Sequence, residues 1–386
     1  MRGGVTTALS LHDFETAAKR FLPRPLYGYV SGAAERNTSL VDNERDFQMY
    51  RFVPRVLVDV SRRTTETNLF GRKHSAPFGV APIGISALLA YQGDLVLAKA
   101  ALDGRIPMVL SGASLTRMEE VSAAAPGSWF QAHLTGDTAK TAALVERVAD
   151  AGYPVLVVTV DIPVLANREN NVRNGFYTPL RPSVSLAWQG ISHPRWTASV
   201  LARTLLTQGM PRFENSYAEP GAPIISSKVE RELGKRDQLD WSIIKHIRER
   251  WKGTLVVKGV LRPDDARQAL AVGADAIIVS NHGGRQLDGA ISPIRALPAI
   301  VEQVAGAVPV MLDGGIRRGT DVLKALALGA AFVFVGRPFI YAAAVGGEAG
   351  VGKAIEILTN EIALNMGLLG ITSIEEAAPD LVLKVA

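Results

Sequence analysis

The chain has 386 residues, of which 47% are hydrophobic and 20% are charged, a balance typical of a compact globular protein. Lys and Arg total 42 against 37 Asp and Glu, for a formal net charge of +5. Without a long basic run or aromatic–basic interleaving, this mild excess argues against a nucleic-acid partner and suits anionic ligands or an anionic membrane surface. No cysteine is present, which excludes disulfides, iron–sulfur clusters, thiolate metal sites and cysteine nucleophiles.

Neither export nor membrane insertion is predicted. The N-terminal MRGGVTTALSLHDF lacks the apolar core of a signal peptide. No run approaches the roughly 18 apolar residues that a membrane-spanning helix needs. We therefore expect a cytoplasmic protein.

In chain order, residues 1–75 predict helices and a loop that close one end of a larger structure. Eight short apolar runs follow, each bounded by Gly, Pro or Asn and typical of buried strands. Stretches such as TAKTAALVERVADAG and RPDDARQALAVGA lie between most of them and predict amphipathic helices that end at glycine. The predicted strands are 78–84, 106–112, 128–134, 154–161, 254–260, 276–284, 308–315 and 332–338.

Eight successive strand–helix units predict an α/β fold, a (β/α)8 TIM barrel built from residues 76–175 and 236–345. An open doubly wound sheet is the alternative, but it would gather functional residues at one switch point. The barrel is favoured because such residues follow nearly every strand. Residues 176–235 form an insertion after the fourth strand, too long for an ordinary loop, and 346–386 predict C-terminal helices of the same single domain.

Glycine-rich turns follow the last two strands, as DGGIRRG (313–319) and GRP (336–338). Barrels commonly bind phosphate there, through backbone N–H groups that glycine lets a ligand approach closely. Arg317 and Arg337 would add charge-assisted hydrogen bonds. Either turn alone could be a mere tight connection, but the pair predicts a phosphate site.

Lys258 ends the apolar run LVVKG and is predicted to point into the barrel mouth. An unpaired ammonium would be costly there. It therefore either pairs with an internal carboxylate or neutralises a ligand, such as a cofactor ring that becomes anionic on reduction.

The stretch VSNHGGRQLDG (279–289) places His282 after a buried strand, with Arg285 close behind. Asp161 ends the fourth strand and is a candidate orienting carboxylate, which would raise the basicity of the histidine and make it a general base. A purely structural histidine is the alternative. With Arg168 on the same rim, these residues predict a carboxylate substrate beside a phosphorylated cofactor.

These motifs resemble those of the FMN-dependent α-hydroxy-acid oxidase/dehydrogenase family, which includes glycolate oxidase, lactate oxidase and flavocytochrome b2. The resemblance runs from LPRPLYGYVSGAAE to near the C-terminus, and SNHGGRQLD is its specific signature. LVDVSRR, ISHPRW and QLDGAISP are most similar to the (S)-mandelate dehydrogenase branch. The resemblance implies FMN as cofactor, no metal, and oxidation of an (S)-2-hydroxy acid to the 2-oxo acid.

By this resemblance His282 is the catalytic base, oriented by Asp161, in either a hydride or a carbanion route. Arg168 and Arg285 match the pair that binds the substrate carboxylate, and Tyr29 matches a tyrosine that positions the substrate. The implied cofactor contacts are Pro82, Ile83 and Gly84 near flavin N5, Ser111, Gln131, Thr159 and Ser280 along the ring and ribityl chain, Lys258 near N1 and O2, and Asp313, Gly314, Gly315, Arg317, Gly336 and Arg337 at the ribityl phosphate.

Two positions depart from the family pattern. His133 stands where the family usually has a tyrosine that faces the substrate. The exchange could alter substrate preference, pH dependence or rate, or merely keep a hydrogen bond. Gly84 stands where several oxidases have alanine, which favours a dehydrogenase.

Residues 185–210 of the insertion stand where mandelate dehydrogenase has its membrane-binding segment. Trp188, Trp196, several leucines and nearby arginines suit a peripheral contact with the inner membrane face. A mobile active-site loop or an oligomer contact is the alternative. The resemblance also implies a homo-oligomer.

The sequence therefore predicts an enzyme that oxidises a mandelate- or lactate-like (S)-2-hydroxy acid, with a quinone, another electron carrier or O2 as the final acceptor. One alternative is a hydrogen-peroxide-forming oxidase. Another is a non-redox phosphate-binding barrel, such as an isomerase or lyase. A flavin-binding protein without turnover is disfavoured because His282, Arg285, Arg168 and Tyr29 are all present.

Overall fold

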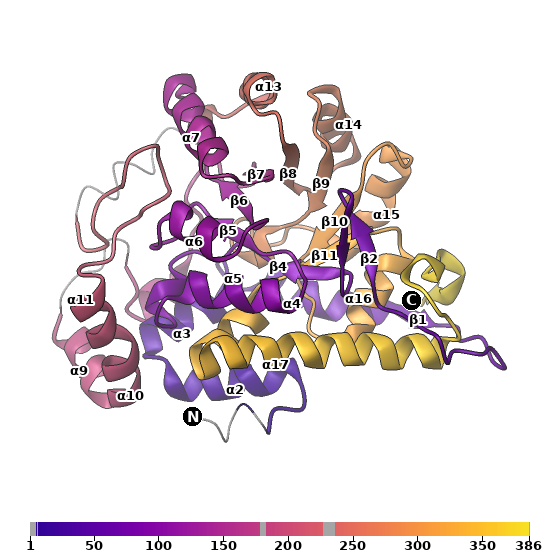
Figure 1. Ribbon diagram of the computed structural model, residues 1–386, viewed down its shortest axis with the longest axis horizontal. Helices are drawn as coiled ribbons and strands as arrows, with labels where there is room; N and C mark the ends of the chain where they lie inside the picture. The colour runs from indigo at the N-terminus through magenta and orange to yellow at the C-terminus, as the bar shows by residue number, and fades with distance from the viewer. Residues whose placement is uncertain (1–4, 6, 178–182, 227–235, 386) are drawn as a thin grey trace.

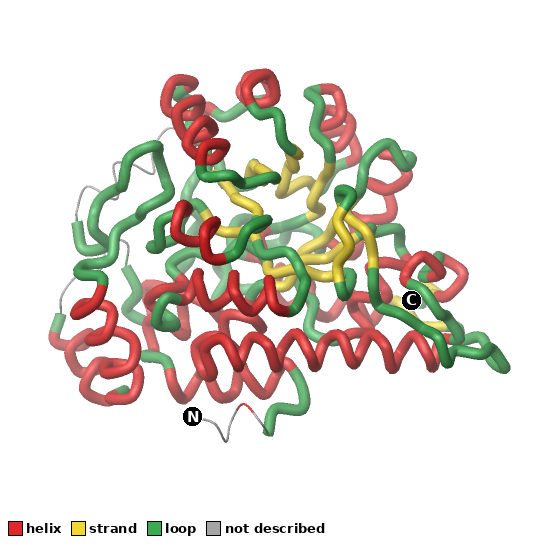
Figure 2. The backbone as a smooth tube through the Cα atoms, viewed as in Figure 1, coloured by secondary structure: helices red, strands yellow, loops and turns green. Residues whose placement is uncertain are grey.

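The computed structural model describes residues 5, 7–177, 183–226 and 236–385. Eight parallel strands form one sheet in the order β4-β11-β10-β9-β8-β7-β6-β5. A bridge between Val80 and Met108 brings the two end strands together, so the sheet closes into a barrel inside a ring of helices (Figures 1 and 2). The predicted (β/α)8 barrel is confirmed. Its strands are β4 (Phe78–Val80), β5 (Val109–Ser111), β6 (Trp129–Ala132), β7 (Val155–Thr159), β8 (Thr254–Val260), β9 (Ala276–Val279), β10 (Val310–Asp313) and β11 (Phe332–Val335).

A helix follows each strand, and this is why the strands are buried on both faces. Short polar caps begin some of these helices; for example, the Asp137 carboxylate accepts hydrogen bonds from the first turn of α7. The helices are, in strand order, α5 (Gly93–Asp103), α6 (Met118–Ala124), α7 (Thr138–Asp150), α13 (Trp241–Arg250), α14 (Pro263–Ala271), α15 (Pro293–Val304), α16 (Gly319–Ala327) and α17 (Arg337–Leu369).

Apolar side chains from alternate strand positions fill the barrel. They include Val109, Trp129, Val157, Val256, Ile278 and Met311. Side chains on a strand alternate between faces, so the residue two positions later points to the same interior. At the carboxyl ends of the strands these later residues are polar, namely Ser111, Gln131, Thr159, Lys258, Ser280 and Asp313. The alternation thus places a polar layer directly above an apolar core.

The N-terminal segment is more than the predicted helices and loop. It contains α2 (Leu11–Phe21), α3 (Arg24–Ser31), α4 (Thr38–Arg45), the turn η1 (Asp46–Met49) and the strands β1 (Tyr50–Phe52), β2 (Thr67–Leu69) and β3 (Arg72–His74). The β2–β3 hairpin inserts Leu69 and Phe70 against the barrel interior, with the Phe70 ring 5.5 Å from that of Trp129. The hairpin therefore closes the end of the barrel opposite the polar layer.

The C-terminal part begins with α17. This element consists of two helices joined at a kink at Gly347, where the backbone is not helical (φ 58°), close to the expected boundary at 346. It packs along α2 and α5 beneath the barrel in the view of Figure 1. The chain ends in the turns η6 (Ile374–Glu376) and η7 (Pro379–Leu381) and the strand β12 (Val382–Lys384), which pairs with β1.

The insertion after β7 is largely helical. It follows α8 (Glu169–Arg173) and contains α9 (Val184–Ser192), α10 (Pro194–Trp196), the π-helical turn η3 (Thr197–Ala202) and α11 (Arg203–Thr207). α9 to α11 lie together at one side of the barrel (Figure 1). Trp196 is only 7% exposed and donates its indole N–H to the carbonyl oxygen of Leu88 (3.0 Å). The expectation that Trp196 faces a membrane is therefore wrong, because this side chain anchors the insertion to the barrel.

Candidate active site

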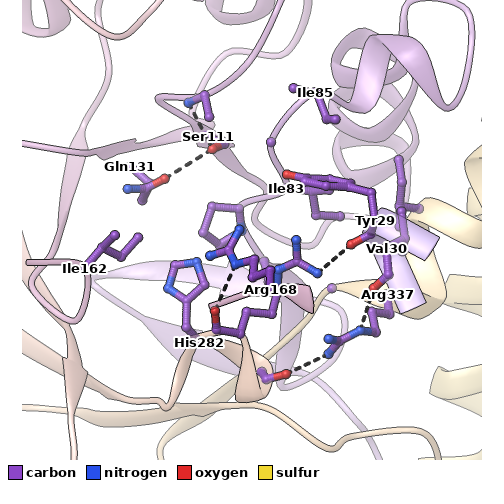
Figure 3. Close-up of a pocket in the computed structure, with 18 of the residues that line it drawn as sticks. Tyr29, Val30, Ile83, Ile85, Ser111, Gln131, Ile162, Arg168, His282 and Arg337 are labelled. Carbon is purple, nitrogen blue, oxygen red and sulfur yellow. Dashed lines mark hydrogen bonds between the residues drawn. The ribbon is translucent and has the colours of Figure 1, made fainter. Parts of the chain in front are cut away.

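A cavity of about 790 Å³ opens where the barrel strands end. Its size and mixed lining are typical of a cofactor or substrate site. Side chains from α3, from the strand ends and from the loops that follow them converge on it (Figure 3). Of the predicted site residues, it is lined by Tyr29, Pro82, Ile83, Gly84, Ser111, Gln131, His133, Arg168, Lys258, His282, Arg285, Asp313, Gly314, Gly315, Arg317, Gly336 and Arg337.

The predicted strand 276–284 included His282. In the structure β9 ends at Val279, so His282 lies beyond the strand. It begins a 3₁₀ turn, η5 (His282–Gly284), and has a left-handed backbone with φ 58°. A non-glycine residue held in this conformation is strained, which is common at functional sites. Gly283 and Gly284 allow the chain to turn and also allow neighbouring segments to pack closely against it. A side chain at Gly283 would meet Arg337 at 2.8 Å, and one at Gly284 would meet the backbone of Leu40 at 2.6 Å.

The strained turn directs His282 to Asp161, just beyond β7. His282 Nδ1 lies 3.0 Å from Asp161 Oδ1, so Nε2 is the ring nitrogen left for a substrate. Burial lowers the pKa of His282, and the attraction of Asp161, which raises it, only partly offsets this. The expected gain in basicity is therefore outweighed by burial. Burial also raises the pKa of Asp161, but the interactions with His282 and the charge of Lys258 together lower it by more, so the pKa of this carboxyl lies below its ordinary value.

Two guanidinium groups lie beside this pair. Arg168 donates to the carbonyl oxygen of Arg285 (2.9 Å) and to Gln286 Oε1 (2.6 Å). Burial and the charge of Arg285 lower the pKa of Arg168 to about 10, which still leaves it protonated at neutral pH. Arg285 donates Nη1 to the carbonyl oxygens of Tyr29 and Gly32 and stacks 4.7 Å from the Tyr29 ring. Arg285 Nη2 is buried and has no partner among the described residues.

Lys258 occupies the barrel mouth. Of the two predicted alternatives, the ion pair with an internal carboxylate is observed. Its ammonium lies 3.0 Å from Asp313 Oδ2 and donates to Ser280 Oγ (2.9 Å). Burial lowers the pKa of Lys258, but the carboxylates of Asp313 and Asp161 raise it by more, so the group stays charged. Lys258 also lines the cavity, so its pairing with Asp313 is compatible with the neutralisation of a ligand.

The turns after β10 and β11 bring backbone and arginines to the cavity. Gly314 and Gly315 have φ values of 101° and 81°, which favour glycine. Arg317 forms an ion pair with Glu44 (2.7 Å). Arg337 donates to the carbonyl oxygens of Val30, Gly283 and Gly32. Burial and the charge of Arg285 lower the pKa of Arg337 to about 9.

Polar groups of the first strands complete this layer. Ser111 Oγ lies 3.3 Å from Gln131 Oε1, and Gln131 Nε2 lies 3.3 Å from His133 Nδ1. Thr159 Oγ1 and Asp313 Oδ1 are buried and have no hydrogen-bond partner in the described parts of the chain. Thr159, Asp161 and Ser280 lie behind the lining, whereas the other predicted residues line it. Unsatisfied buried groups of this kind indicate a bound ligand.

Sequence reasoning missed the outer wall of the cavity. This wall comes from the connection between β7 and α13, most of which is the insertion, and includes Ile162, Leu165, Phe176, Tyr177, Phe213, Ile224 and Arg236. Little in the sequence could have found them, because the segment has neither a repeating pattern nor a motif. Among the described residues, no cluster of three or more His, Asp or Glu could hold a metal ion, and no helix is long and apolar enough to cross a membrane.

The donor set fits an FMN group. The positive-φ glycines leave backbone open to a phosphate near Arg317 and Arg337. The unpartnered Thr159 and Asp313 oxygens can meet ribityl hydroxyls, and Lys258 is placed to face the anionic edge of a flavin ring. Apolar residues such as Ile83 and Ile340 line the same cavity.

Comparisons with known proteins agree with this geometry. The family model of FMN-dependent dehydrogenases matches residues 18–384. An L-lactate dehydrogenase of Ectopseudomonas mendocina is 40% identical over 96% of this chain and 98% of its own, and a 2-hydroxyacid oxidase of Dictyostelium discoideum is 38% identical over 95% and 88%. The crystal structure of (S)-mandelate dehydrogenase, described as a monotopic membrane protein, is 34% identical over 98% of this chain and 100% of its own, with a TM-score of 0.89. The chain therefore belongs to the FMN-dependent dehydrogenase family, and it is an FMN-dependent oxidoreductase that oxidises the CH–OH group of 2-hydroxy acids.

Proposed function

We propose that the protein oxidises a mandelate- or lactate-like (S)-2-hydroxy acid to the 2-oxo acid, with His282 as the base. The observation that supports this proposal is the His282–Asp161 pair (3.0 Å) in the same cavity as Arg168 and Arg285. The two arginines bind the substrate carboxylate and Tyr29 positions the acid. The substrate's carbinol group then faces the free Nε2 of His282.

In this proposal His282 accepts the proton that leaves the substrate, and Asp161 stabilises the imidazolium that forms. FMN supplies a two-electron acceptor when bound. Arg317, Arg337 and the backbone at Gly314, Gly315 and Gly336 would hold its phosphate. Asp313, Ser280 and Thr159 would hold the ribityl chain, Ser111, Gln131 and Lys258 would hold the ring, and Pro82, Ile83 and Gly84 would lie beside it.

We propose a quinone or another electron carrier as the final acceptor. Gly84 supports this, because several oxidases of the family have alanine at this position. In this chain an alanine would be crowded, since its Cβ would lie 3.1 Å from the Ala113 Cβ and 3.3 Å from the Tyr29 hydroxyl. A hydrogen-peroxide-forming oxidase is the second candidate, since relatives include a 2-hydroxyacid oxidase. Measuring oxygen uptake against dye reduction with the same substrate distinguishes the two.

The test of the proposed reaction is the visible spectrum of the purified protein under anaerobic conditions. Addition of (S)-mandelate or (S)-lactate should bleach the flavin band, whereas the (R)-acids should not. A yellow protein that no (S)-2-hydroxy acid bleaches would refute the proposal.

The pH dependence of the reaction should follow His282. The base must be neutral, so kcat/KM should fall as the pH drops through the histidine pKa, which burial places below its ordinary value. Asp161→Asn removes the charge that raises this pKa, so the acid limb should move to lower pH. The plateau rate should also fall, because a weaker base accepts the proton less readily. An acid limb that moves to higher pH in Asp161→Asn would contradict the assignment.

We also propose a peripheral membrane contact through the insertion. Trp188 on α9 is 63% exposed, and Val184, Ile191 and Leu206 are exposed on the same helical segment. Apolar and aromatic side chains beside basic residues suit a membrane interface. Assembly into a homo-oligomer stays a prediction.

After lysis without detergent at low salt, part of the wild-type protein should sediment with membranes. Trp188→Glu should move that part into the supernatant, because a carboxylate at the interface opposes docking. Leu364→Glu on α17, at a side chain that is 61% exposed, is the matched control and should leave sedimentation unchanged. Wild-type protein found wholly in the supernatant would argue against membrane contact.

A further inference from the structure

Arg236 is a cavity residue to which the proposed reaction gives no role. It begins the short turn η4 (Arg236–Gln238) between the insertion and α13. Its two neighbours, Asp237 and Gln238, are exposed, whereas Arg236 is partly buried and lines the cavity. The turn therefore sends one cation inward and leaves the residues after it in solvent.

No carboxylate among the described residues forms an ion pair with Arg236. Its Nε is buried and has no hydrogen-bond partner in the described residues. Burial lowers the pKa of the group, which reflects the cost of holding this charge away from water. By contrast, Arg147 pairs with Glu119 at 2.8 Å and Arg317 with Glu44 at 2.7 Å. An unpaired guanidinium in a cavity wall is an anion site that lacks its anion.

Packing places Arg236 on the same side of the cavity as His133. Both residues line the cavity, and η4 lies against the loop that follows His133, since a Cβ at Gly136 would meet Gln238 at 2.5 Å. In agreement, the charge of Arg236 adds to burial in lowering the pKa of His133. Arg236 therefore lies beside His133, the residue that stands where the family has a tyrosine facing the substrate.

The cations of the cavity can be matched with their anions. Lys258 has Asp313, and Arg317 has Glu44. The proposed phosphate lies near Arg317 and Arg337, and the proposed substrate carboxylate lies between Arg168 and Arg285. After these assignments Arg236 has no counter-charge in the parts of the chain that the structure describes. A substrate with one carboxylate leaves it unpaired.

We infer that the preferred substrate is a 2-hydroxy acid with a second carboxylate on its side chain, and that Arg236 binds this second carboxylate. The inference rests on the proposed function, because it takes the first carboxylate to lie at Arg168 and Arg285. The side chain then extends from the carbinol carbon past His133 towards η4. Arg236 is thus a specificity-determining residue, and the oxidation itself does not require it.

The test compares acids that match in carbon number and differ in charge: (S)-2-hydroxyglutarate with (S)-2-hydroxypentanoate, and (S)-malate with (S)-2-hydroxybutanoate. Anaerobic flavin reduction gives the rate and the apparent affinity for each acid. The wild-type protein should prefer the dicarboxylate of a pair by roughly tenfold to one-hundredfold in kcat/KM, as expected for a buried charged hydrogen bond. Arg236→Gln should abolish this preference and leave kcat/KM for the monocarboxylate nearly unchanged, whereas Arg236→Lys should keep part of it.

Asp237→Ala, at the exposed neighbour in η4, is the control and should keep the wild-type preference. FMN absorbance shows that each variant is folded. A wild-type protein that prefers the monocarboxylates would overturn the inference, as would an Arg236→Gln variant that loses rate equally on both acids, because that result would assign Arg236 to the tuning of His133. If no acid of either kind reduces the flavin, the proposed function itself fails, and the monocarboxylate measurements distinguish that outcome.

Discussion

His282→Ala is expected to retain FMN and to lower the rate of flavin reduction by substrate by roughly 10²- to 10⁴-fold. The imidazole is the one group in the cavity that combines a nitrogen held by a carboxylate (Asp161, 3.0 Å) with a second nitrogen free to accept a proton. Cofactor binding should survive, because the alanine removes no contact of the proposed phosphate site. Stopped-flow absorbance under anaerobic conditions measures the effect.

His12→Ala is the matched control, since this histidine lies exposed on α2 outside the cavity, and it should leave the rate unchanged. His282→Gln tests the loss differently, because it preserves size and hydrogen bonding but removes the base. Flavin reduction by His282→Ala at the wild-type rate would refute the assignment of His282 as base.

Gly315→Ala should be among the most destabilising single substitutions in the cavity. Gly315 has φ 81°, and a Cβ there would lie 1.9 Å from the backbone oxygen of Asn43. Main chain cannot yield as a flexible side chain can, so α4 would have to move away from the barrel. We expect a loss of about 3 kcal/mol or more in the free energy of unfolding, from the overlap added to the strained backbone, together with weaker FMN binding. Urea titration of the holoenzyme measures the loss of stability, and flavin release on dilution measures the weaker FMN binding.

Gly306→Ala separates the two causes. Gly306 has nearly the same backbone angle (φ 78°) but nothing within 4 Å of its added Cβ, so it should cost only the conformational part, about 1–2 kcal/mol. Equal losses in the two variants would mean that the contact between the β10 turn and Asn43 does not restrain the barrel mouth.

The role of the η5 turn follows from its neighbours. It bonds to Asp161 through His282 and to Arg337 through the Gly283 carbonyl oxygen. Its Gly284 carbonyl oxygen accepts a hydrogen bond from the backbone N–H of Ala34, in the connection between α3 and α4 (3.0 Å). A single short turn thus joins the proposed base to the proposed phosphate site. Substitutions at Gly283 or Gly284 should therefore affect catalysis and cofactor binding together.

Local sequence patterns were sufficient to predict the barrel and most of its polar mouth. The eight apolar runs fixed the strands, because a segment buried on both faces must be apolar throughout. The polar residue that ends each run, such as Gln131 or Lys258, had to share a face with the apolar residue two positions earlier, Trp129 or Val256. Glycine-rich turns with Arg317 and Arg337 identified the phosphate end of the cavity, because the glycines and the arginine of each turn are only a few residues apart in the sequence.

Only the tertiary structure decided the contacts that join distant segments. Barrel closure at Val80 and Met108, the burial of Trp196 against Leu88 and the inward position of Arg236 depend on how the insertion and the helices pack. None of these has a local signal, since an arginine or a tryptophan in an irregular segment can face solvent or core equally well. The sequence determines which residues can reach the barrel mouth, and packing determines which of them face the substrate.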